Sequence, residues 1–370
     1  MIKKFLLIII VFFLIVFFGY RFLESQSDKV DSQEILEIYQ QDNHSQYFYS
    51  KLNEKDQETY RRIYYTFVNF SRSIPLEESN SDKVSNIFQN VLDDHPEIYY
   101  INSEFQYTDT HKFIFIPKFD LTQEQVEKTN QAIQQKTSGI IHEATQQKDD
   151  IQKAKLLYDY IIKNVEYKEQ VGDDQKIPSA LLDQKSVCAG YARAYQYLLH
   201  QVNISCAYIT GDSKIETENR PGYDGHAWNM VKINGDYYYC DTTWGDTVDD
   251  DMEHTCYAYF LMDSEDMLKC YQPDSAYEKT SELGNPYFRS VDGYMGRYDE
   301  NVLSRAIQQG LKNKTRIAEI KCENQAVYER VKRNLKSDYL GYRLLTKNKC
   351  WSDHSFYYCM DELKVIELYY

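Results

Sequence analysis

A cysteine, a histidine and an aspartate, each in a distinctive local sequence, could together do chemistry in this chain. Cys188 lies in the segment SVCAGYARAY, His226 in GHAWN and Asp241 in DTTW. A thiol is mostly protonated near neutral pH. It becomes a useful nucleophile when an imidazole takes its proton and a third group orients that imidazole. The three residue types therefore predict an enzyme with a cysteine nucleophile.

The residues around Cys188 predict that it lies at the start of a helix. The preceding letters DQKS are polar and typical of a loop, whereas apolar residues recur at helical spacing over residues 189–200. At a helix N-terminus the macrodipole and the free backbone N–H groups favour a thiolate and lower the pKa of the thiol. We also expect the backbone N–H of Cys188 to donate to an oxyanion.

The histidine and the aspartate are predicted to share one β-hairpin. His226 opens a strand-like run that ends at Asn234-Gly235, the strongest short hairpin signal, and the return strand runs up to Asp241. A two-residue turn places Asp241 opposite Trp228, two positions from His226 on the same face, which is the diagonal distance at which long side chains meet. We therefore expect Asp241 to accept the Nδ1 proton of His226.

These motifs closely resemble the transglutaminase-like superfamily, with its papain-like fold, and are most similar to small bacterial, membrane-anchored transglutaminase-like domain proteins. The resemblance is specific over about residues 150–265. It implies an α+β core, in which a helix bearing the cysteine packs on an antiparallel sheet bearing the histidine and the aspartate. It also implies Cys188 as nucleophile, His226 as general base and Asp241 as the orienting carboxylate. The superfamily includes crosslinking enzymes, deamidases, peptidases, glycoprotein amidases and inactive scaffolds, so the substrate stays open.

Four further residues near the motifs have two possible roles. We expect Trp228 and Trp244 to form walls of the site, with contact to a substrate as the alternative. Tyr191 and Asn229 could shape an oxyanion site, or they could serve only packing and hydrogen bonding.

Neither a metal site nor a cofactor site is predicted. Acidic residues follow the DTTW motif, but their spacing does not match an EF-hand, and a solvated loop is expected (Asp246, Asp249, Asp250, Asp251, Glu253). The other seven histidines are scattered, with no His-x-x-x-His or Cys-x-x-Cys pair to indicate zinc. A phosphate-binding glycine-rich loop is also missing from the sequence.

The N-terminal sequence predicts a single membrane anchor at residues 1–23. Lys3 and Lys4 precede an apolar run from Phe5 to Phe18, and Arg21 ends it. The basic residues place the start in the cytoplasm and the remaining chain outside. No small-residue cleavage site follows, which favours an uncleaved signal-anchor over a cleaved signal peptide; cleavage would make the protein secreted.

Composition supports an anchored extracytoplasmic protein. The net charge of −15 argues against nucleic-acid binding. If Cys188 is a free nucleophile, seven cysteines remain, enough for at most three disulfides. Cys322 with Cys350 or Cys359, and Cys256 with Cys270, are near in sequence, whereas two others lie in apolar strands and could be buried free thiols (Cys206, Cys240).

The pattern of predicted elements divides the chain into five parts. They are an anchor, a polar stalk, an α+β module, the catalytic core and a second α+β module (1–23, 24–50, 51–120, 121–275, 280–370). Both modules follow the order helix, strand, helix, hairpin. We therefore suspect that the two flanking modules are alike and arose by duplication.

The predicted function is extracytoplasmic acyl transfer. A Cys188 thiolate would attack a protein or peptide amide, form a thioacyl-enzyme, and pass the acyl group to an amine or to water. A surface protein or a cell-wall peptide would be the partner. The alternatives are a cysteine peptidase and an inactive surface module that holds peptides or glycans.

Overall fold

The computed structural model describes most of the chain from Asp31 onward (residues 31–41, 46–109, 112–168, 175–215, 224–247, 254–275, 277–337 and 339–370). The predicted membrane anchor lies outside the described residues. Within these ranges, none of the helices combines the length and the apolar character needed to cross a membrane. The chain divides into two compact units, one that ends at Gln134 and one that begins at Gln135. Helices and strands are mixed in both, so the predicted α+β class is confirmed.

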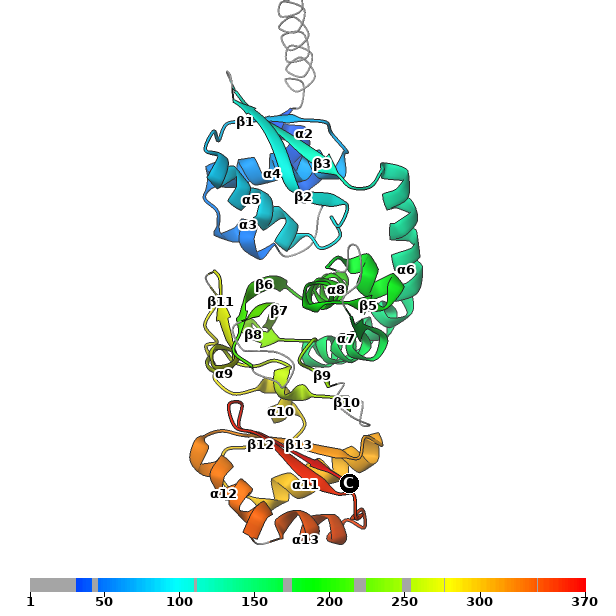
Figure 1. The fold of residues 1–370 in the computed structure, drawn as a ribbon, viewed down its shortest axis with the longest axis vertical. Coiled ribbons are helices and arrows are strands. Elements are labelled where there is room, and N and C mark those ends of the chain that lie inside the picture. Colours follow the sequence, from blue (N-terminus) through cyan, green and yellow to red (C-terminus); the bar gives the residue numbers. More distant parts are fainter. Residues whose placement is uncertain are drawn as a thin grey trace, which may run out of the picture. The chain divides into compact units, whose positions relative to one another are not determined.

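The first unit packs helices on one face of a small antiparallel sheet (Figure 1). The sheet order is β1-β3-β2. The elements in chain order are α2 (Ser32–Gln40), α3 (Tyr47–Lys51), α4 (Glu54–Val68), β1 (Ile74–Leu76), α5 (Ser81–Asp94), β2 (Ile101–Asp109) and β3 (Phe113–Phe119). The rings of Phe67 on α4 and Phe88 on α5 contact Phe115 on β3, and these contacts form the core of the unit.

One local expectation for this unit was wrong. Residues 32–40, expected within a polar stalk, form α2, and its Ile35 and Tyr39 are buried, with Tyr39 against rings of α4. The N-cap of α5 is Asn80, because its side chain accepts the backbone N–H of Lys83 and so leaves Ser81 as the first helical residue.

The part of the second unit that carries Cys188, His226 and Asp241 is a four-stranded antiparallel sheet covered by helices (Figure 1). The sheet order is β11-β6-β7-β8, with β6 (Cys206–Ser213), β7 (Asp224–Ile233), β8 (Asp236–Cys240) and β11 (Tyr271–Pro273). Helix α8 (Cys188–Gln201) lies against β6 and β7, and α7 (Asp150–Asn164) packs on α8. The remaining elements are α6 (Gln123–Thr145), which begins in the first unit, β4 (Glu166–Tyr167), η1 (Ser179–Asp183), β5 (Lys185–Ser186), β9 (Asp246–Thr247), β10 (His254–Thr255), η2 (Tyr257–Tyr259) and α9 (Ser264–Cys270).

The C-terminal part of the second unit is a second helix-covered sheet, with strand order β12-β13-β15-β14. Its elements are α10 (Pro286–Ser290), β12 (Tyr294–Met295), α11 (Glu300–Asn313), β13 (Ile317–Cys322), α12 (Gln325–Ser337), α13 (Leu340–Lys347), β14 (Phe356–Met360) and β15 (Val365–Tyr369). One face of the sheet joins the three longest helices in an apolar core (Figure 1). Helix α13 was not predicted, although its buried Leu344 and Leu345 belong to this core.

The two small α+β modules share a topology. In each, a helix, a strand and a helix precede a β-hairpin, and the second hairpin strand lies between the other two. The order β1-β3-β2 corresponds to β13-β15-β14, and all four pairings are antiparallel. The two modules thus share the order of these three strands, whereas β12 and α13 have no counterpart among the described residues of the first module.

All eight cysteines fall within the described ranges, and each is a free thiol. The cysteine pairs suggested by their proximity in sequence therefore form no disulfide bonds. Cys322 lies on β13 and Cys359 on β14, and both strands pair with β15, which separates them. Two strand spacings amount to about 10 Å, more than a disulfide can span.

Candidate active site

A short strand and a helix start together position the Cys188 thiol. Strand β5 pairs in parallel with β4, and the Ser186 hydroxyl lies 2.9 Å from the Ser179 hydroxyl, which fixes the approach to the helix. Val187 is extended and caps the helix, and Cys188 is its first residue. The predicted position of Cys188 at a helix N-terminus is confirmed. Its thiol is partly exposed, so a substrate can reach it.

The predicted hairpin forms with the predicted register. Ile233 pairs with Asp236 around Asn234 and Gly235, whose φ angles of 53° and 91° fit a tight two-residue turn. Strand β8 ends at Cys240, so Asp241 is the first residue beyond the ladder. On the other side of β7, His226 pairs with Gly211 of β6, which holds the histidine inside the sheet.

The His226 imidazole and the Asp241 carboxylate meet in a direct hydrogen bond of 2.6 Å. The ring atom is Nε2, so the expectation that Asp241 would accept the Nδ1 proton was wrong. Asp241 lies in the turn after β8 and faces the outer end of the ring, whereas Nδ1 is the nitrogen nearer the backbone. The Cys188 sulfur lies close enough to this imidazole to help raise its pKa. One imidazole thus interacts with both the thiol and the carboxylate.

The Asp241 carboxylate is fully buried and accepts four hydrogen bonds. Oδ2 accepts from His226 and from the Tyr271 hydroxyl at 2.7 Å. Oδ1 accepts the backbone N–H groups of Thr243 and Trp244 at 2.8 and 3.0 Å. Buried charges are stable only when they are paired and hydrogen-bonded. This arrangement therefore holds a buried negative charge against the imidazole.

The pKa of His226 is raised to about 10, even though its burial alone would lower it. The charge and the hydrogen bond of Asp241 outweigh the cost of burial, and the interaction with the Cys188 sulfur adds to them. A neighbouring negative charge favours the protonated imidazole. At neutral pH the site therefore favours an imidazolium between the thiol and the carboxylate.

Tyr271, the first residue of β11, belongs to the site but was not predicted. Its ring stacks on His226 at 5.8 Å with an interplanar angle of 7°, and its hydroxyl donates to Asp241. It therefore covers the imidazole and holds the carboxylate at once. Strand β11 is only three residues long and pairs with β6, and no local motif marks such a strand.

The two tryptophans differ in exposure. Trp228 is fully buried and stacks on Tyr271 with 4.7 Å between ring centroids, so it forms a wall of the site and has no surface for a substrate. Trp244 is partly exposed, and its ring centroid lies 6.4 Å from that of His226. Of the two, only Trp244 has a surface that a substrate could touch.

Tyr191 and Asn229 are used for structure. The Tyr191 hydroxyl lies 2.5 Å from the carbonyl of Val165 and 2.8 Å from the Asp246 carboxylate, and it can donate to either. The Asn229 amide donates to the carbonyl of Ala192 at 3.0 Å and ties β7 to α8. Both side chains are completely buried, which favours their structural role over an oxyanion role.

The turn after Asp241 is clamped by Tyr158 of α7. The Tyr158 hydroxyl contacts the carbonyls of Asp241 at 3.0 Å and Cys256 at 3.2 Å. It lies where a Cβ on Gly245 would be, so only glycine leaves it room. The conformation that presents the Asp241 carboxylate is therefore supported from a helix outside the sheet. Of the predicted acidic loop, Asp246 accepts from Tyr191, and residues 249–253 lie outside the described residues.

Comparison with known proteins places these residues in a family. A family model of the Transglutaminase-like superfamily matches residues 138–242. The kyphoscoliosis peptidase of Mus musculus is 26% identical over 137 residues, which are 35% of this chain and 20% of that protein. The chain thus spans about a fifth of the length of this curated relative.

Two solved structures are also similar to parts of the chain. A TGase structure has a TM-score of 0.29 and 13% identity, and the match covers 59% of this chain and 63% of that one. The periplasmic domain of TgpA from Pseudomonas aeruginosa, bound to ethylmercury, has a TM-score of 0.24 and 17% identity, and covers 36% and 55%. At these scores the structural likenesses add nothing to the family match.

Proposed function

Because the chain belongs to the transglutaminase-like superfamily through residues 138–242, we propose that it is a cysteine enzyme that transfers acyl groups from protein or peptide amides. The observation that supports this most strongly is the imidazole of His226, which is hydrogen-bonded to a buried carboxylate and has its pKa raised further by its interaction with Cys188. Cys188 is the proposed nucleophile, His226 the proton carrier and Asp241 the group that orients it.

The proposed reaction begins with an ion pair. The Cys188 proton rests on His226, so the thiolate attacks the amide carbon and a C–S bond forms. The oxyanion that develops can accept from the backbone N–H of Cys188, which, as the first residue of α8, has no partner within the helix. When the C–N bond breaks, the leaving amine takes the proton from His226 and a thioacyl-enzyme remains.

The second half of the reaction restores the thiol. An amine or a water molecule gives its proton to His226 and attacks the thioacyl carbon. The C–S bond then breaks and the sulfur leaves as the thiolate, again beside a protonated imidazole. The product is a new amide if an amine attacks and a carboxylic acid if water does. The kyphoscoliosis peptidase is named for peptide cleavage, so we include hydrolysis of peptide bonds as the alternative outcome.

We further propose that the enzyme acts outside the cytoplasmic membrane, held by residues 1–23 as a single-pass anchor. Two lysines before an unbroken apolar run support this orientation. Its substrate would then be a surface protein or a cell-wall peptide. If the segment is cleaved, the same enzyme would be secreted.

The thiol chemistry is tested by alkylation of the purified full-length chain with iodoacetamide across pH 5–10, read by peptide mass spectrometry. Cys350 and Cys359 are also partly exposed and serve as reference thiols in the same sample. We expect Cys188 to react well below pH 8.5, the ordinary pKa of a thiol, and His226→Ala to remove that reactivity without changing the two references.

If Cys188 reacts like Cys350 and Cys359 in both proteins, the acyl-transfer proposal is wrong. A folded chain without a reactive thiol would indicate a surface module that binds peptides or glycans. If the thiol is activated, ammonia release from a glutamine peptide, with and without a primary amine, separates transfer from hydrolysis. Cys188→Ala is the control for background release.

A further inference from the structure

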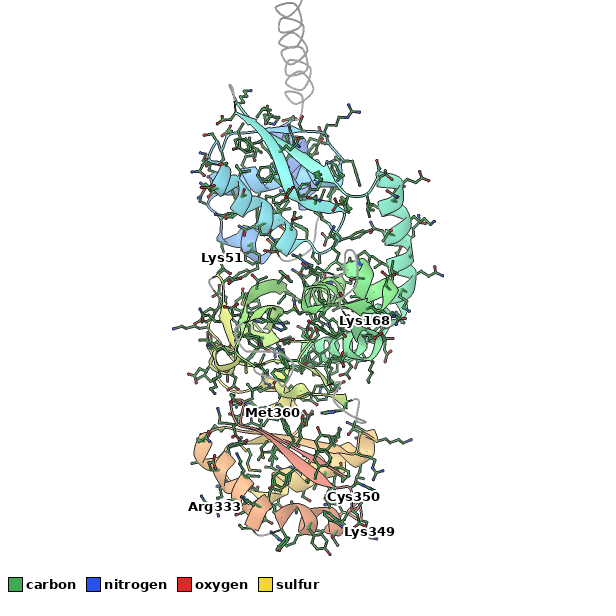
Figure 2. The ribbon with its side chains drawn as sticks, in the orientation of Figure 1. Lys51, Lys168, Arg333, Lys349, Cys350 and Met360 are labelled. Carbon is green, nitrogen blue, oxygen red and sulfur yellow. The ribbon has the colours of Figure 1, made fainter. Side chains whose placement is uncertain are left out.

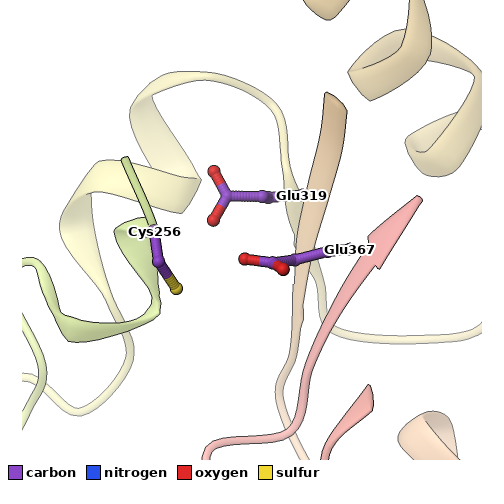
Figure 3. Close-up of side chains that lie close together, drawn as sticks. All are labelled: Cys256, Glu319 and Glu367. Carbon is purple, nitrogen blue, oxygen red and sulfur yellow. The ribbon is translucent and has the colours of Figure 1, made fainter. Parts of the chain in front are cut away.

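A second group of reactive side chains lies outside the proposed active site, where the C-terminal sheet faces the segment after β10. Glu319 on β13 and Glu367 on β15 lie directly opposite one another in the antiparallel ladder. Cys256 lies between β10 and η2 and is completely buried. The three possible ligand atoms all lie within 4.8 Å of one another, and the three side chains point toward a common centre (Figure 3).

The sheet has two unlike faces, and this group is on the face opposite the core formed with α11, α12 and α13. Ala318, Ile320, Ile366 and Leu368 alternate with the two glutamates and point into the apolar core under the helices. The glutamates therefore project from the opposite face. Met360, at the end of β14, borders this face, and its sulfur lies 4.0 Å from the Cys256 sulfur (Figure 2).

Two facing carboxylates in such a place need a positive partner. Like charges directly opposite on a sheet are destabilising, and burial increases the cost. Among the described residues, neither glutamate forms an ion pair with lysine or arginine; Lys321, on the same face, is paired with Asp266. Few hydrogen-bond donors within the described ranges reach the two glutamates. The Tyr257 N–H reaches Glu319 at 2.9 Å, and the Tyr369 hydroxyl reaches Glu367 at 2.5 Å.

One oxygen in the group is buried without a hydrogen-bond donor. Glu367 is 1% exposed, and its Oε1 has no hydrogen-bond partner among the described residues. Nε2 of His254 lies 3.5 Å from this oxygen, too far for a good hydrogen bond. A buried carboxylate oxygen without a donor, close to a thiol and a second carboxylate, is expected of a metal ligand.

We propose that Cys256, Glu319 and Glu367 bind one divalent transition-metal ion, with Zn²⁺ preferred. A thiolate with carboxylates suits zinc, which takes Cys and Asp/Glu ligands, whereas calcium and magnesium take oxygen ligands only. Binding releases the Cys256 proton and any proton held between the two glutamates. His254 is an outer partner through Tyr369: its Nε2 lies 3.0 Å from the Tyr369 hydroxyl, which donates to Glu367.

The proposed metal ion would connect two parts of the second unit. Cys256 donates its backbone N–H to the carbonyl of Gly245 at 2.9 Å and accepts from the Tyr158 hydroxyl, which also contacts the Asp241 carbonyl. A metal at Cys256 therefore ties the C-terminal sheet to the turn that presents Asp241. Metal binding itself does not depend on the proposed reaction.

Metal binding is tested on the full-length chain carrying Cys188→Ser, because a thiol beside an imidazole and a carboxylate could itself capture zinc. After chelation and dialysis, ZnCl₂ is titrated in competition with a chromophoric chelator, and CoCl₂ is added separately to detect thiolate-to-cobalt charge transfer. We expect one equivalent of Zn²⁺ to bind and a charge-transfer band to form with Co²⁺.

Four further variants locate the ion. His254→Ala removes an outer partner and should weaken zinc binding by roughly 10- to 100-fold. Cys256→Ser removes a proposed ligand, so it should abolish the cobalt band and weaken zinc binding by more than that. Glu319→Gln should also weaken it by more than that range, and it should fold because the glutamine can still accept the Tyr257 N–H. Cys322→Ser, equally buried but on the helix face of β13, should change nothing.

Circular dichroism of the metal-free variants keeps folding and binding apart. If Glu319→Gln is folded and binds Zn²⁺ as tightly as its parent, the proposal is wrong. It is also wrong if the parent binds no stoichiometric zinc, in which case the two glutamates share a proton. Equal binding by the Cys256→Ser variant would place the metal elsewhere on the chain and contradict the proposal too.

Discussion

Asp241 and the pair Glu319–Glu367 carry carboxylates in the same unit, but their surroundings differ. Asp241 and Glu367 are buried, and Glu319 is half-buried. Asp241 accepts four hydrogen bonds, two of them from backbone N–H groups. The two glutamates face each other with few donors, and burial followed by the charge of Glu367 raises the pKa of Glu319. A buried negative charge thus persists where donors surround it. Elsewhere it requires a proton or a cation.

The largest effect should come from Asp241→Asn, which changes the carboxylate that accepts four hydrogen bonds. An amide NH₂ cannot accept the Nε2–H of His226, so the imidazole loses its orientation and its charge partner. We expect amide turnover to fall by about 10⁴-fold, as for the equivalent change in a serine protease triad. The measurement is ammonia release from a glutamine peptide, alongside alkylation of Cys188.

Asp236→Asn is the matched control for this variant. The Asp236 carboxylate also accepts backbone N–H groups, from Ser281 and Glu282, at the far end of the same hairpin. It should leave turnover unchanged. A loss of less than about 10-fold for Asp241→Asn would show that Asp241 does not orient His226.

The next effect is a pH-dependent contribution of His226 to stability. Its pKa is about 10 in the folded protein, above the ordinary 6.5. Because the folded-state pKa is raised, the stabilisation is fully present below pH 6.5 and is lost as pH rises through 10. Its size should be several kcal/mol, since one pKa unit corresponds to about 1.4 kcal/mol.

This contribution is measured as the difference in unfolding free energy between the wild type and His226→Gln. Urea unfolding at pH 6, 8 and 10 should show the difference shrinking at each step. A difference that stays constant from pH 6 to 10 would mean that the imidazole is neutral in the folded protein.

A smaller effect is expected from Tyr271→Phe, which removes one of the four donors to Asp241 and keeps the ring on His226. Loss of a hydrogen bond to a charged group costs about 1.5–3 kcal/mol. Tyr271 is a positioning residue, so the pH profile of Cys188 alkylation should shift as well.

Tyr239→Phe is the control, because Tyr239 is also fully buried and its hydroxyl donates to the Glu278 carbonyl. Equal shifts in both variants would rule out a specific role for Tyr271.

The smallest effect is expected from Glu367→Gln in the presence of a chelator. This change removes one of two facing charges, so the unfolding free energy should stay constant or rise by up to about 1 kcal/mol. Removal of a donor to Asp241 should instead lower the unfolding free energy, so the two changes have opposite signs. Urea unfolding measures it, with Glu319→Gln as the partner variant. A clear loss of stability in both would show that the pair is already satisfied without a metal.

Much of the local structure could be predicted from the sequence because it depends on neighbouring residues. The Asn234-Gly235 turn sets the register of the hairpin, and apolar spacing after Cys188 marks the helix. Local sequence is ambiguous where adjacent residues compete for one role. Asn80 and Ser81 can both cap a helix, and only the backbone path decides between them.

Contacts between distant segments could not be predicted in the same way. Tyr271 reaches the site because β11 pairs with β6, and Cys256 faces two glutamates more than 60 residues away because one sheet face packs against the segment after β10. Neither contact leaves a periodic or local pattern in the chain. Sheet pairing between distant strands depends on the packing of whole elements, which one short segment does not encode.

The sequence by itself determined which residues could do chemistry, where the helix at Cys188 begins and how the His226 hairpin pairs. Turn residues and hydrophobic periodicity act over a few positions, so these features can be derived from the amino-acid sequence. Only the tertiary structure decided that Nε2 faces Asp241, that Tyr271 completes the carboxylate's hydrogen bonds, and that Glu319 and Glu367 meet Cys256. The physical reason is that ring orientation, donor count and ligand geometry depend on where separate elements pack in space.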